Sequence, residues 1–435
     1  MRSLPIRAVV IVVLRITILA LVVSPLGPSS AAEDPANVVE AVNVDVVAPA
    51  PLPGIGIPRD HVPSNVQSLT ADIFNETGLG GSREAFQQAF TALARRCQLP
   101  TTLTLMGLGA LPASDERFLG MLGMHGTVEA NLAMHHADLI VCVGARFDDR
   151  ITGRLDAFSP GSKKIHIDID PSSINKNVKV DIGIVGDCRE VLADMIAIWK
   201  ETKPELNKVA LNDWKRQIDL WRARKSFSYQ NSDQIIKPQY AIERLYQLTK
   251  GREVFVTTEV GQHQMWAAQH FHFEEPNRWM TSGGLGTMGY GLPAAVGVQL
   301  AHPKALVIDI AGEASILMNM QEMSTAAQYR LPIKIFILNN EYMGMVRQWQ
   351  ELLHGGRYSE SYSEALPDFV KLAEAYGHVG IKIEKPGDVE GALREAFRQK
   401  ERLVFMDFIT DQTENVFPMV PGGKGLTEMI LAEEL

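Results

Sequence analysis

Two apolar runs separated by one helix-length segment do most to limit how this chain can fold. Residues 305–310 and 333–338 are rich in Ile, Val, Leu and Phe, as strands buried inside a parallel sheet are. The first run is followed by Glu313 and the second by Asn340, and their separation of 27 positions fits one crossover helix. We therefore expect adjacent parallel strands that place Glu313 and Asn340 side by side at their carboxyl ends.

The residue types at these two strand ends predict a site for a diphosphate and its metal ion. A glycine turn carries one carboxylate, Glu313, and the second run ends in an amide, Asn340. Their oxygens can hold Mg²⁺, which keeps its other positions for phosphate oxygens and water.

The same alternation of apolar runs and helical segments covers most of the chain, so we predict an α/β fold with two doubly wound parallel-sheet domains. The expected parts are a signal-like and linker segment (1–80), a central domain (81–200), a connecting helix (201–240) and a C-terminal domain (241–435). The predicted strands are Thr102–Leu105, Leu139–Val143, Lys164–Ile169, Asp181–Val185, Val254–Thr257, Ala305–Ile310, Ile333–Leu338 and Val404–Phe408. Turns after the four central strands form a crevice suited to a nucleotide. Trp214 and Trp221, seven residues apart, give the connecting helix one apolar face.

Charge and cysteine content exclude several classes of protein. A formal net charge of −9, with no Lys/Arg-rich run in the body of the chain, argues against nucleic-acid binding. Small anionic substrates therefore need a local positive site. Cys97, Cys142 and Cys188 lack metal-ligand spacing, and an odd number of cysteines fits a reducing compartment, so we expect packing residues.

The N-terminus imitates a secretory signal. Arg2 and Arg7 precede an apolar stretch, 8–23, which is followed by small residues up to Ala32. Arg15 interrupts that stretch, and about 16 residues fall short of the about 20 that a membrane span needs. We expect a cytoplasmic protein with no membrane segment, with export as the alternative, and a poorly ordered linker over 33–79.

Two other motifs suggest alternatives. Gly284 to Gly289 satisfies the dinucleotide pattern G-x-G-x-x-G, and Asp309 lies twenty residues beyond it, where an NAD ribose partner would sit. The context is poor, because residues 278–281 make a weak preceding strand and Asp309 directly precedes the Gly-Glu turn. His125 and the pair His135-His136 suggest a zinc site, but no carboxylate or cysteine cluster accompanies them at suitable spacing.

Several longer stretches identify a family. The Gly-Glu turn and Asn-Asn pair resemble the thiamine diphosphate motif, whose usual form begins Gly-Asp. Residues 261–266, 321–326 and 345–350 resemble the catalytic subunit of acetolactate synthase (acetohydroxyacid synthase) nearly word for word, and the resemblance runs from Leu103 to the C-terminus.

The resemblance implies a transferase of branched-chain amino-acid synthesis. Such enzymes decarboxylate pyruvate on thiamine diphosphate and add the two-carbon unit to pyruvate or 2-ketobutyrate, with Mg²⁺ and FAD as further cofactors. They are homodimers or homotetramers, often with a small regulatory subunit. Another thiamine-dependent decarboxylase or oxidase is disfavoured by Met345 and by residues 348–350.

The resemblance also assigns residues. Thiamine diphosphate would contact Val260, Gly261, Gln262, His263, Gly286, Met288, Gly312, Glu313, Ala314, Ser315, Asn340, Tyr342, Met343, Gly344 and Met345. Mg²⁺ would be bound by Glu313, Asn340 and the backbone carbonyl of Tyr342. FAD would contact Leu105, Met106, Met124, His125, Gly126, Gly144, Arg146, Asp168, Ile169, Gly186 and Asp187. Met288 would support the cofactor in its V shape and Trp349 would select the second substrate. The alternative for Arg146 is an ion pair with Asp148 or Asp149.

Two departures from the family pattern set expectations. Glu313 stands where the family has Asp, and its extra methylene moves the carboxylate outward, so we expect weaker Mg²⁺ binding. The residues before Leu103 contain no recognisable pyrimidine-binding domain and no activating glutamate. The alternative to an active carboligase is therefore a non-catalytic, cofactor-binding remnant of this family.

Overall fold

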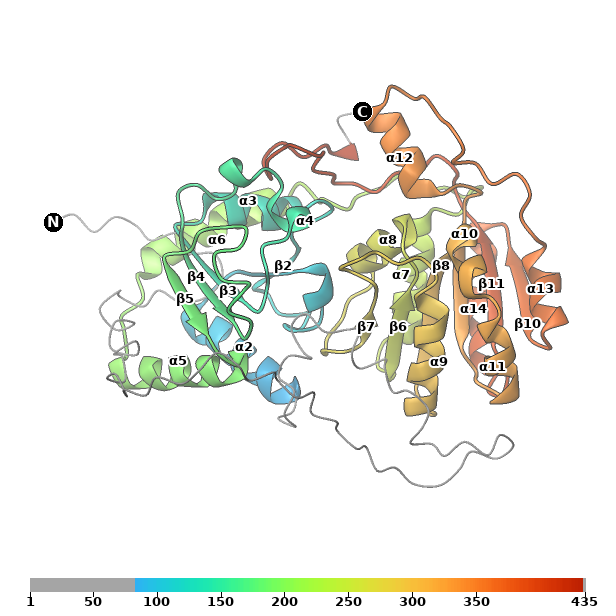
Figure 1. The fold of residues 1–435 in the computed structure, drawn as a ribbon, viewed down its shortest axis with the longest axis horizontal. Helices are drawn as coiled ribbons and strands as arrows, with labels where there is room; N and C mark the ends of the chain where they lie inside the picture. The colour runs from blue at the N-terminus through green and yellow to red at the C-terminus, as the bar shows by residue number, and fades with distance from the viewer. Residues whose placement is uncertain (1–82, 433–435) are drawn as a thin grey trace, which may run out of the picture.

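The computed structural model describes residues 83–432, which form two α/β lobes, shown at the left and right of Figure 1. The signal-like segment and the whole of the linker, residues 1–80, lie outside the described residues. Within them, no helix combines the length and apolar character that a bilayer span requires.

The N-terminal lobe holds five short parallel strands in two sheets. The strands are β1 (Thr101–Leu103) and β2 (Phe118–Met121), which pair, and β3 (Leu139–Val143), β4 (Lys163–Asp168) and β5 (Ile182–Val185), which form a second sheet in that order. The helices are α2 (Arg83–Cys97), α3 (Val128–His136), α4 (Asp149–Thr152), α5 (Cys188–Thr202) and α6 (Lys208–Arg222). The four predicted strands exist, but the first pairs with a strand that the sequence analysis missed.

The C-terminal lobe is built on one parallel sheet of six strands in the order β10-β11-β9-β8-β6-β7. The strands are β6 (Val254–Thr258), β7 (Trp279–Met280), β8 (Leu306–Gly312), β9 (Lys334–Asn339), β10 (Val379–Ile383) and β11 (Val404–Ile409). The helices are α7 (Pro238–Thr249), α8 (Gln262–His270), α9 (Gly291–Ala301), α10 (Glu313–Ile316), α11 (Glu322–Gln328), α12 (Gly344–Leu353), α13 (Phe369–Ala375) and α14 (Val389–Arg398). Single 3₁₀ turns lie at Leu105–Gly107, Leu155–Ala157, Leu317–Asn319 and Pro386–Asp388.

The central prediction about this sheet is confirmed. β8 and β9 are parallel neighbours, with Gly312 in register with Leu338, so their ends lie at the same edge. Every residue of both strands is buried. The sequence analysis was wrong about residues 278–281, because Trp279 and Met280 do form a strand, in register with Val256 and Thr257. Two residues are too few to give a periodic signal.

Side-chain alternation divides the C-terminal lobe into two cores, one on each face of its sheet. Ile308, Phe336 and Met406 belong to a cluster that includes residues of α7, α8 and α14. Val307 and Ile335 belong to a second cluster with residues of α9, α11 and α13. Because successive residues of a strand point to opposite faces, a strand covered on both faces must be apolar throughout, as β8 and β9 nearly are.

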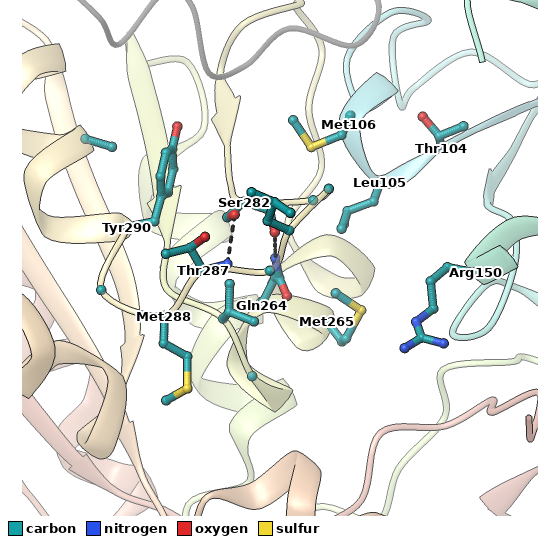
Figure 2. Close-up of a pocket in the computed structure, with 18 of the residues that line it drawn as sticks. Thr104, Leu105, Met106, Arg150, Gln264, Met265, Ser282, Thr287, Met288 and Tyr290 are labelled. Carbon is teal, nitrogen blue, oxygen red and sulfur yellow. Dashed lines mark hydrogen bonds between the residues drawn. The ribbon is translucent and has the colours of Figure 1, made fainter. Parts of the chain in front are cut away.

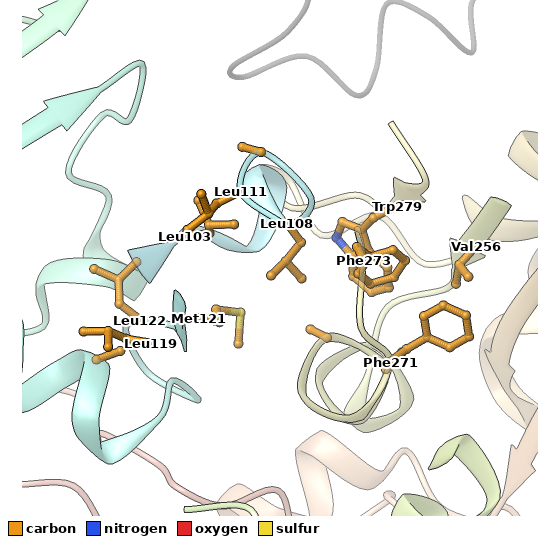
Figure 3. Close-up of a cluster of buried hydrophobic side chains, with 14 of the residues drawn as sticks. Leu103, Leu108, Leu111, Leu119, Met121, Leu122, Val256, Phe271, Phe273 and Trp279 are labelled. Carbon is orange, nitrogen blue, oxygen red and sulfur yellow. The ribbon is translucent and has the colours of Figure 1, made fainter. Parts of the chain in front are cut away.

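The cluster that includes α7 and α8 continues into the N-terminal lobe, as Figure 3 shows. Side chains from the two lobes meet there without an intervening polar layer. The N-terminal lobe contributes Leu103, Leu108, Leu111, Leu119, Met121 and Leu122, and the C-terminal lobe contributes Val256, Phe271, Phe273 and Trp279. Cys97, Cys142 and Cys188 are buried in this same cluster, as predicted for packing residues. The two lobes therefore share one core.

The segment after β11, drawn in dark red in Figure 1, returns to the N-terminal lobe. The N–H of Val420 donates to the carbonyl of Met124 at 2.8 Å, and Nδ1 of His125 lies 2.9 Å from the carbonyl oxygen of Pro418. Gln348 of α12 holds the same segment, because its amide both accepts from the N–H of Val416 (2.8 Å) and donates to the Val416 carbonyl (3.0 Å). This backbone pairing fixes one lobe against the other.

Lys334, at the start of β9, is a buried lysine that pairs with no acidic side chain among residues 83–432. Its Nζ donates to the carbonyls of Pro332 (2.6 Å) and Gln399 (2.9 Å), and burial lowers the pKa of Lys334 to about 7. Between pH 7 and about 10 the unfolded chain keeps a proton that the folded chain has lost, so stability rises with pH in this window. Lys334→Met should lack this rise.

Urea unfolding at pH 7.0 and 8.5 measures the effect. We expect wild type to gain about 1 to 2 kcal/mol relative to Lys334→Met over this interval. Lys382→Met, at an exposed lysine that pairs with Glu384 at 2.8 Å, is the matched control and should follow wild type. Equal pH dependence in all three proteins would show that Lys334 stays charged when folded.

Candidate functional site

A cavity of about 1610 Å³ lies where the two lobes face each other, and residues of both lobes line it. Pockets for a single small molecule usually measure about 300 to 1,000 Å³. The space is therefore large enough for more than one ligand.

The strand ends of the N-terminal lobe form one wall of this cavity. The predicted FAD contacts that line it are Leu105, Met106, Met124, His125, Gly144 and Arg146. Five other predicted contacts, Gly126, Asp168, Ile169, Gly186 and Asp187, do not line it. Of these, Asp187 accepts from the N–H of Arg189 as the N-cap of α5, and Asp168 accepts from the N–H of Asp170 at 2.9 Å.

Two histidines of this lobe, His125 and His136, have structural partners. Burial lowers the pKa of His125 to about 4, so its imidazole is neutral beside the carbonyl of Pro418. The ring of His136 stacks on Trp221, 5.6 Å away, on the apolar face predicted for the connecting helix. Across residues 83–432, no three His, Cys, Asp or Glu side chains are grouped as metal ligands.

Two arginines bring positive charge to the cavity wall. Arg146 pairs with Asp148 at 3.0 Å, which is the ion pair that the sequence analysis gave as its alternative, and it also lines the cavity. The guanidinium of Arg150 lies 5.9 Å from the ring centroid of Trp349, and both residues line the cavity. Arg150 was not predicted as a site residue. It follows two aspartates, and such a run of charged residues is typical of a solvent-exposed segment. Its position over Trp349 depends on packing between the lobes.

The glycine-rich loop 282–290 forms part of the opposite wall (Figure 2). The Ser282 hydroxyl accepts from the N–H of Thr287 at 2.9 Å, and the Ser282 carbonyl accepts from Nε2 of Gln264 at 3.4 Å, so the loop is tied to α8. Gly286 and Met288, both predicted cofactor contacts, line the cavity together with the exposed Leu285.

The structure contradicts the dinucleotide alternative for this loop. The N–H groups of Gly289, Gly291 and Leu292, which would bind a phosphate at the start of α9, donate to the carboxylate of Glu259 instead. Asp309 is not at a strand end. It lies within β8 and is fully buried, accepting from Thr257 at 3.0 Å, so it cannot reach a ribose.

The ends of β6 and β8 carry the predicted diphosphate residues. Val260 and Gly261 line the cavity, whereas Gln262 and His263 are buried at the start of α8. Gly312 is required by close packing, because a Cβ there would lie 2.8 Å from Nδ1 of His263. Burial lowers the pKa of His263 to about 3, and its Nε2 is buried with no protein partner. A neutral imidazole carries a single N–H, so Nε2 of His263 donates to a phosphate oxygen in the tautomer that has the proton on Nε2.

Glu313 lies at the start of α10, followed by Ala314 and by Ser315, which caps the turn through Gly312. The Glu313 side chain is 1% exposed, and its Oε1 has no hydrogen-bond partner. Burial raises the pKa of Glu313 to about 8, while the N–H of Asn340 acts in the opposite direction. A buried carboxylate oxygen without a partner is suited to a bound cation.

The predicted metal ligands on the turn after β9 are close to this carboxylate. Asn340 is 5% exposed; its Oδ1 accepts from the N–H of Tyr342, and its Nδ2 donates to Gln262, each at 3.2 Å. Beyond Tyr342, Met343 is exposed, Gly344 starts α12, and Met345 and Trp349 line the cavity. The structure thus brings together Glu313, Asn340 and Tyr342 around one edge of the sheet. Their role as ligands remains a prediction.

Comparisons with known proteins agree with this arrangement. Residues 77–195 match the family model for the central domain of thiamine pyrophosphate enzymes, and residues 259–408 match that for the C-terminal TPP binding domain. The chain is 52% identical over 340 residues to the acetolactate synthase large subunit of Haemophilus influenzae, covering 78% of this chain and 59% of that protein.

Two further relatives show the same relation. Identity is 50% over 358 residues to the acetolactate synthase isozyme 3 large subunit of Escherichia coli, covering 82% of this chain and 62% of the relative. The chain is also 44% identical over 351 residues to the mitochondrial acetolactate synthase catalytic subunit of Saccharomyces cerevisiae, covering 78% of this chain and 50% of that relative. The chain thus spans between half and about three fifths of the length of these relatives.

Proposed function

Because the chain belongs to the acetolactate synthase large-subunit group of thiamine pyrophosphate enzymes, we propose that it is a carboligase that joins 2-oxo acids. Its substrates would be pyruvate alone, or pyruvate with 2-ketobutyrate, and its products 2-acetohydroxy acids and CO₂. One observation supports the proposal most: the glycine loop with Met288, the turn after β6 at Gly261, and Trp349 with Arg150 all adjoin one cavity.

The residues present fit thiamine diphosphate. Gly286 leaves room for close approach of a ligand to the backbone, and Nε2 of His263 is a buried polar atom without a hydrogen-bond partner among the described residues. When bound, the cofactor supplies a carbon nucleophile that attacks a 2-oxo acid and accepts the electrons released by decarboxylation. The chain itself would hold the diphosphate through residues 260–263 and 312–315 and support the thiazolium side with Met288.

The residues around Glu313 fit Mg²⁺. The unpartnered Oε1 of Glu313 is available for a hard cation, and the amide of Asn340 and the carbonyl of Tyr342 are oxygen donors on the next strand. Glu313, Asn340 and Tyr342 would hold the metal, which would supply positive charge for the diphosphate. Binding would also favour the ionised form of Glu313, whose pKa burial raises.

The N-terminal wall fits FAD in part. Leu105, Met106 and Met124 give apolar contact area for a flat ring, and the guanidinium of Arg146 can pair with a diphosphate. Two pairs of predicted contacts lie at the ends of β4 and β5 and do not line the cavity: Asp168 with Ile169, and Gly186 with Asp187. Only the far end of a ligand as long as FAD would reach them. The cavity volume of about 1610 Å³ accommodates FAD beside thiamine diphosphate.

Arg150 would supply the positive charge that an anionic substrate needs in a protein of net charge −9. Its guanidinium over Trp349 can pair with the carboxylate of the second 2-oxo acid, while the indole contacts the alkyl end. Exclusion of water by this apolar wall would protect the carbon nucleophile from protonation. The names of the relatives further suggest a small regulatory subunit, and we expect a homodimer or homotetramer.

Formation of acetolactate by the purified chain with pyruvate, thiamine diphosphate, Mg²⁺ and FAD tests the proposal. Arg150→Gln should lower kcat/KM by about 10- to 150-fold, because a hydrogen bond to a charged group contributes about 1.5–3 kcal/mol. Arg154→Gln, at a nearby arginine that pairs with Asp156 outside the cavity, should match wild type. Wild type that makes no acetolactate would support the non-catalytic alternative. Equal kcat/KM for Arg150→Gln would remove Arg150 from the site.

FAD binding is a separate prediction. Titration calorimetry of the wild-type chain should show saturable binding, and Arg146→Ala should weaken it by about 10-fold or more through loss of a charged pair with the diphosphate. Arg216→Ala on α6 is the matched control, since Arg216 is exposed and lies away from the cavity. A folded wild-type chain that binds no FAD would refute the assignment.

Glu313→Asp should tighten Mg²⁺-dependent binding of thiamine diphosphate. The shorter carboxylate matches the compact octahedral shell of Mg²⁺ better, and a gain of about 1 to 2 kcal/mol corresponds to about 5- to 30-fold in affinity. Calorimetric titrations with and without Mg²⁺ measure it, with Glu322→Asp on α11 as the control. Unchanged or weaker Mg²⁺ dependence would show that the backbone already accommodates the longer side chain.

A further inference from the structure

Glu259, the residue directly after β6, is fully buried and makes an unusual set of contacts. Its Oε1 accepts from the N–H groups of Gly291 (2.9 Å) and Leu292 (3.2 Å), and its Oε2 accepts from the N–H of Gly289. A charged acceptor shared by three backbone donors is among the stronger hydrogen-bonding arrangements in proteins. The carboxylate therefore occupies the N-terminus of α9, where the helix dipole favours negative charge.

These contacts join two walls of the cavity. Glu259 immediately precedes Val260 and Gly261, and its bond to Gly289 holds the residue that follows Met288. Asn319 holds the same point from the other side, through its Nδ2 and the Gly289 carbonyl. Glu259 thus links the position of Met288 directly to that of Val260.

A second buried acid, Asp309 of β8, packs beneath this carboxylate. Gly291 packs tightly against both Glu259 and Asp309. A Cβ at this position would lie 2.2 Å from Oδ1 of Asp309 and 2.8 Å from the backbone nitrogen of Glu259. Oδ1 of Asp309 accepts from Thr257, and its Oδ2 has no partner. The remaining titratable neighbours are His263 of α8, whose ring bonds to the Glu259 backbone, and Tyr290 of the loop.

The two acids do not carry two charges in this space. Burial raises the pKa of Glu259 to about 7, and burial together with the charge of Glu259 raises the pKa of Asp309 well above its usual range. The backbone donors favour the charge on Glu259 and none faces Oδ2 of Asp309. Asp309 is therefore the neutral member of the pair.

We propose that Glu259 is a positioning residue that sets the place of Met288 and of the 286–292 segment against the diphosphate loop, a role that rests on the proposed thiamine diphosphate site. It acts through the backbone and touches neither substrate nor cofactor. Asp309 serves as a neutral support under Gly291, so its charge contributes nothing to this role.

Amide hydrogen exchange of the full chain without cofactor tests the positioning itself. Glu259→Gln replaces one acceptor oxygen by an NH₂ group facing backbone donors, so the amides of 289–292 should exchange at least tenfold faster at pH 7.5. Asp309→Asn should leave them within about threefold of wild type. Glu253→Gln, at the exposed opposite end of β6, is the matched control. Exchange within twofold of wild type in Glu259→Gln, or equal loss in Asp309→Asn, would overturn the proposal.

The pH dependence gives a readout that a merely structural role would not move. After correction for intrinsic exchange rates, protection of 289–292 in wild type should fall as the pH drops from 8 to 6, because protonation of Glu259 removes the charged acceptor. Glu259→Gln should show no such transition. Glu259→Asp keeps the charge but has a shorter side chain, so its 289–292 amides should be better protected than those of Glu259→Gln and less protected than those of wild type. This variant replaces Glu259→Gln in the test if Glu259→Gln does not fold. A flat wild-type profile would count against the proposal.

Calorimetric titration with thiamine diphosphate and Mg²⁺ connects the segment to the cofactor. Affinity should fall at least fivefold in Glu259→Gln and stay near wild type in Asp309→Asn. If wild type binds no thiamine diphosphate, the proposed function fails while the exchange data still decide whether Glu259 holds the segment. If exchange increases in Glu259→Gln but affinity is unchanged, the proposed function stands and the positioning role is wrong.

Discussion

The hydrophobic core that continues from one lobe into the other is the constraint on which the rest of the structure depends. Leu108 and Met121 of one lobe belong to the same buried cluster as Phe273 and Trp279 of the other. Burying a large apolar side chain contributes about 1.5–3 kcal/mol, so a cluster of this size opposes relative movement of the lobes. The walls of the cavity are consequently held at one spacing, and a site composed from both lobes can have a defined shape.

Hydrogen bonds at the edge of that core fix the orientation of one lobe relative to the other. The segment after β11 pairs its backbone with Met124 and with the amide of Gln348, and the Gln269 side chain donates to the carbonyls of both His125 and Phe417. These donors and acceptors are buried, and each would be costly if left without a partner. Hydrophobic contact alone is not directional, so these bonds select the arrangement in which Arg150 lies over Trp349.

The six-stranded sheet holds buried acids, two within its strands (Asp309 and Asp407) and two directly after strand ends (Glu259 and Glu313). Burial raises the pKa of Glu259, Asp309, Glu313 and Asp407, and Asp407 is partly compensated by a 2.9 Å bond from Asn339. The acids differ in what compensates them. Three backbone N–H groups donate to Glu259, whereas one oxygen of Glu313 has no hydrogen-bond donor among the described residues. The first carboxylate therefore fixes the position of a backbone segment, and the second is suited to bind a cation.

Local sequence determined much of the fold and part of the candidate site. Strongly apolar, β-branched runs predicted β3, β6, β8, β9 and β11 to within two residues, because buried parallel strands leave a continuous signal, and the spacing after β8 placed Glu313 beside the turn of Asn340. Only the tertiary structure decided the pairing of β1 with β2, the strand at Trp279, the contact of Arg150 with Trp349, and the occupation of the α9 N-terminus by Glu259. These features join residues 30 or more positions apart or are too short to be periodic. A sequence pattern records what each residue prefers locally, whereas the partner of a buried charge is set by whichever segment packing brings against it.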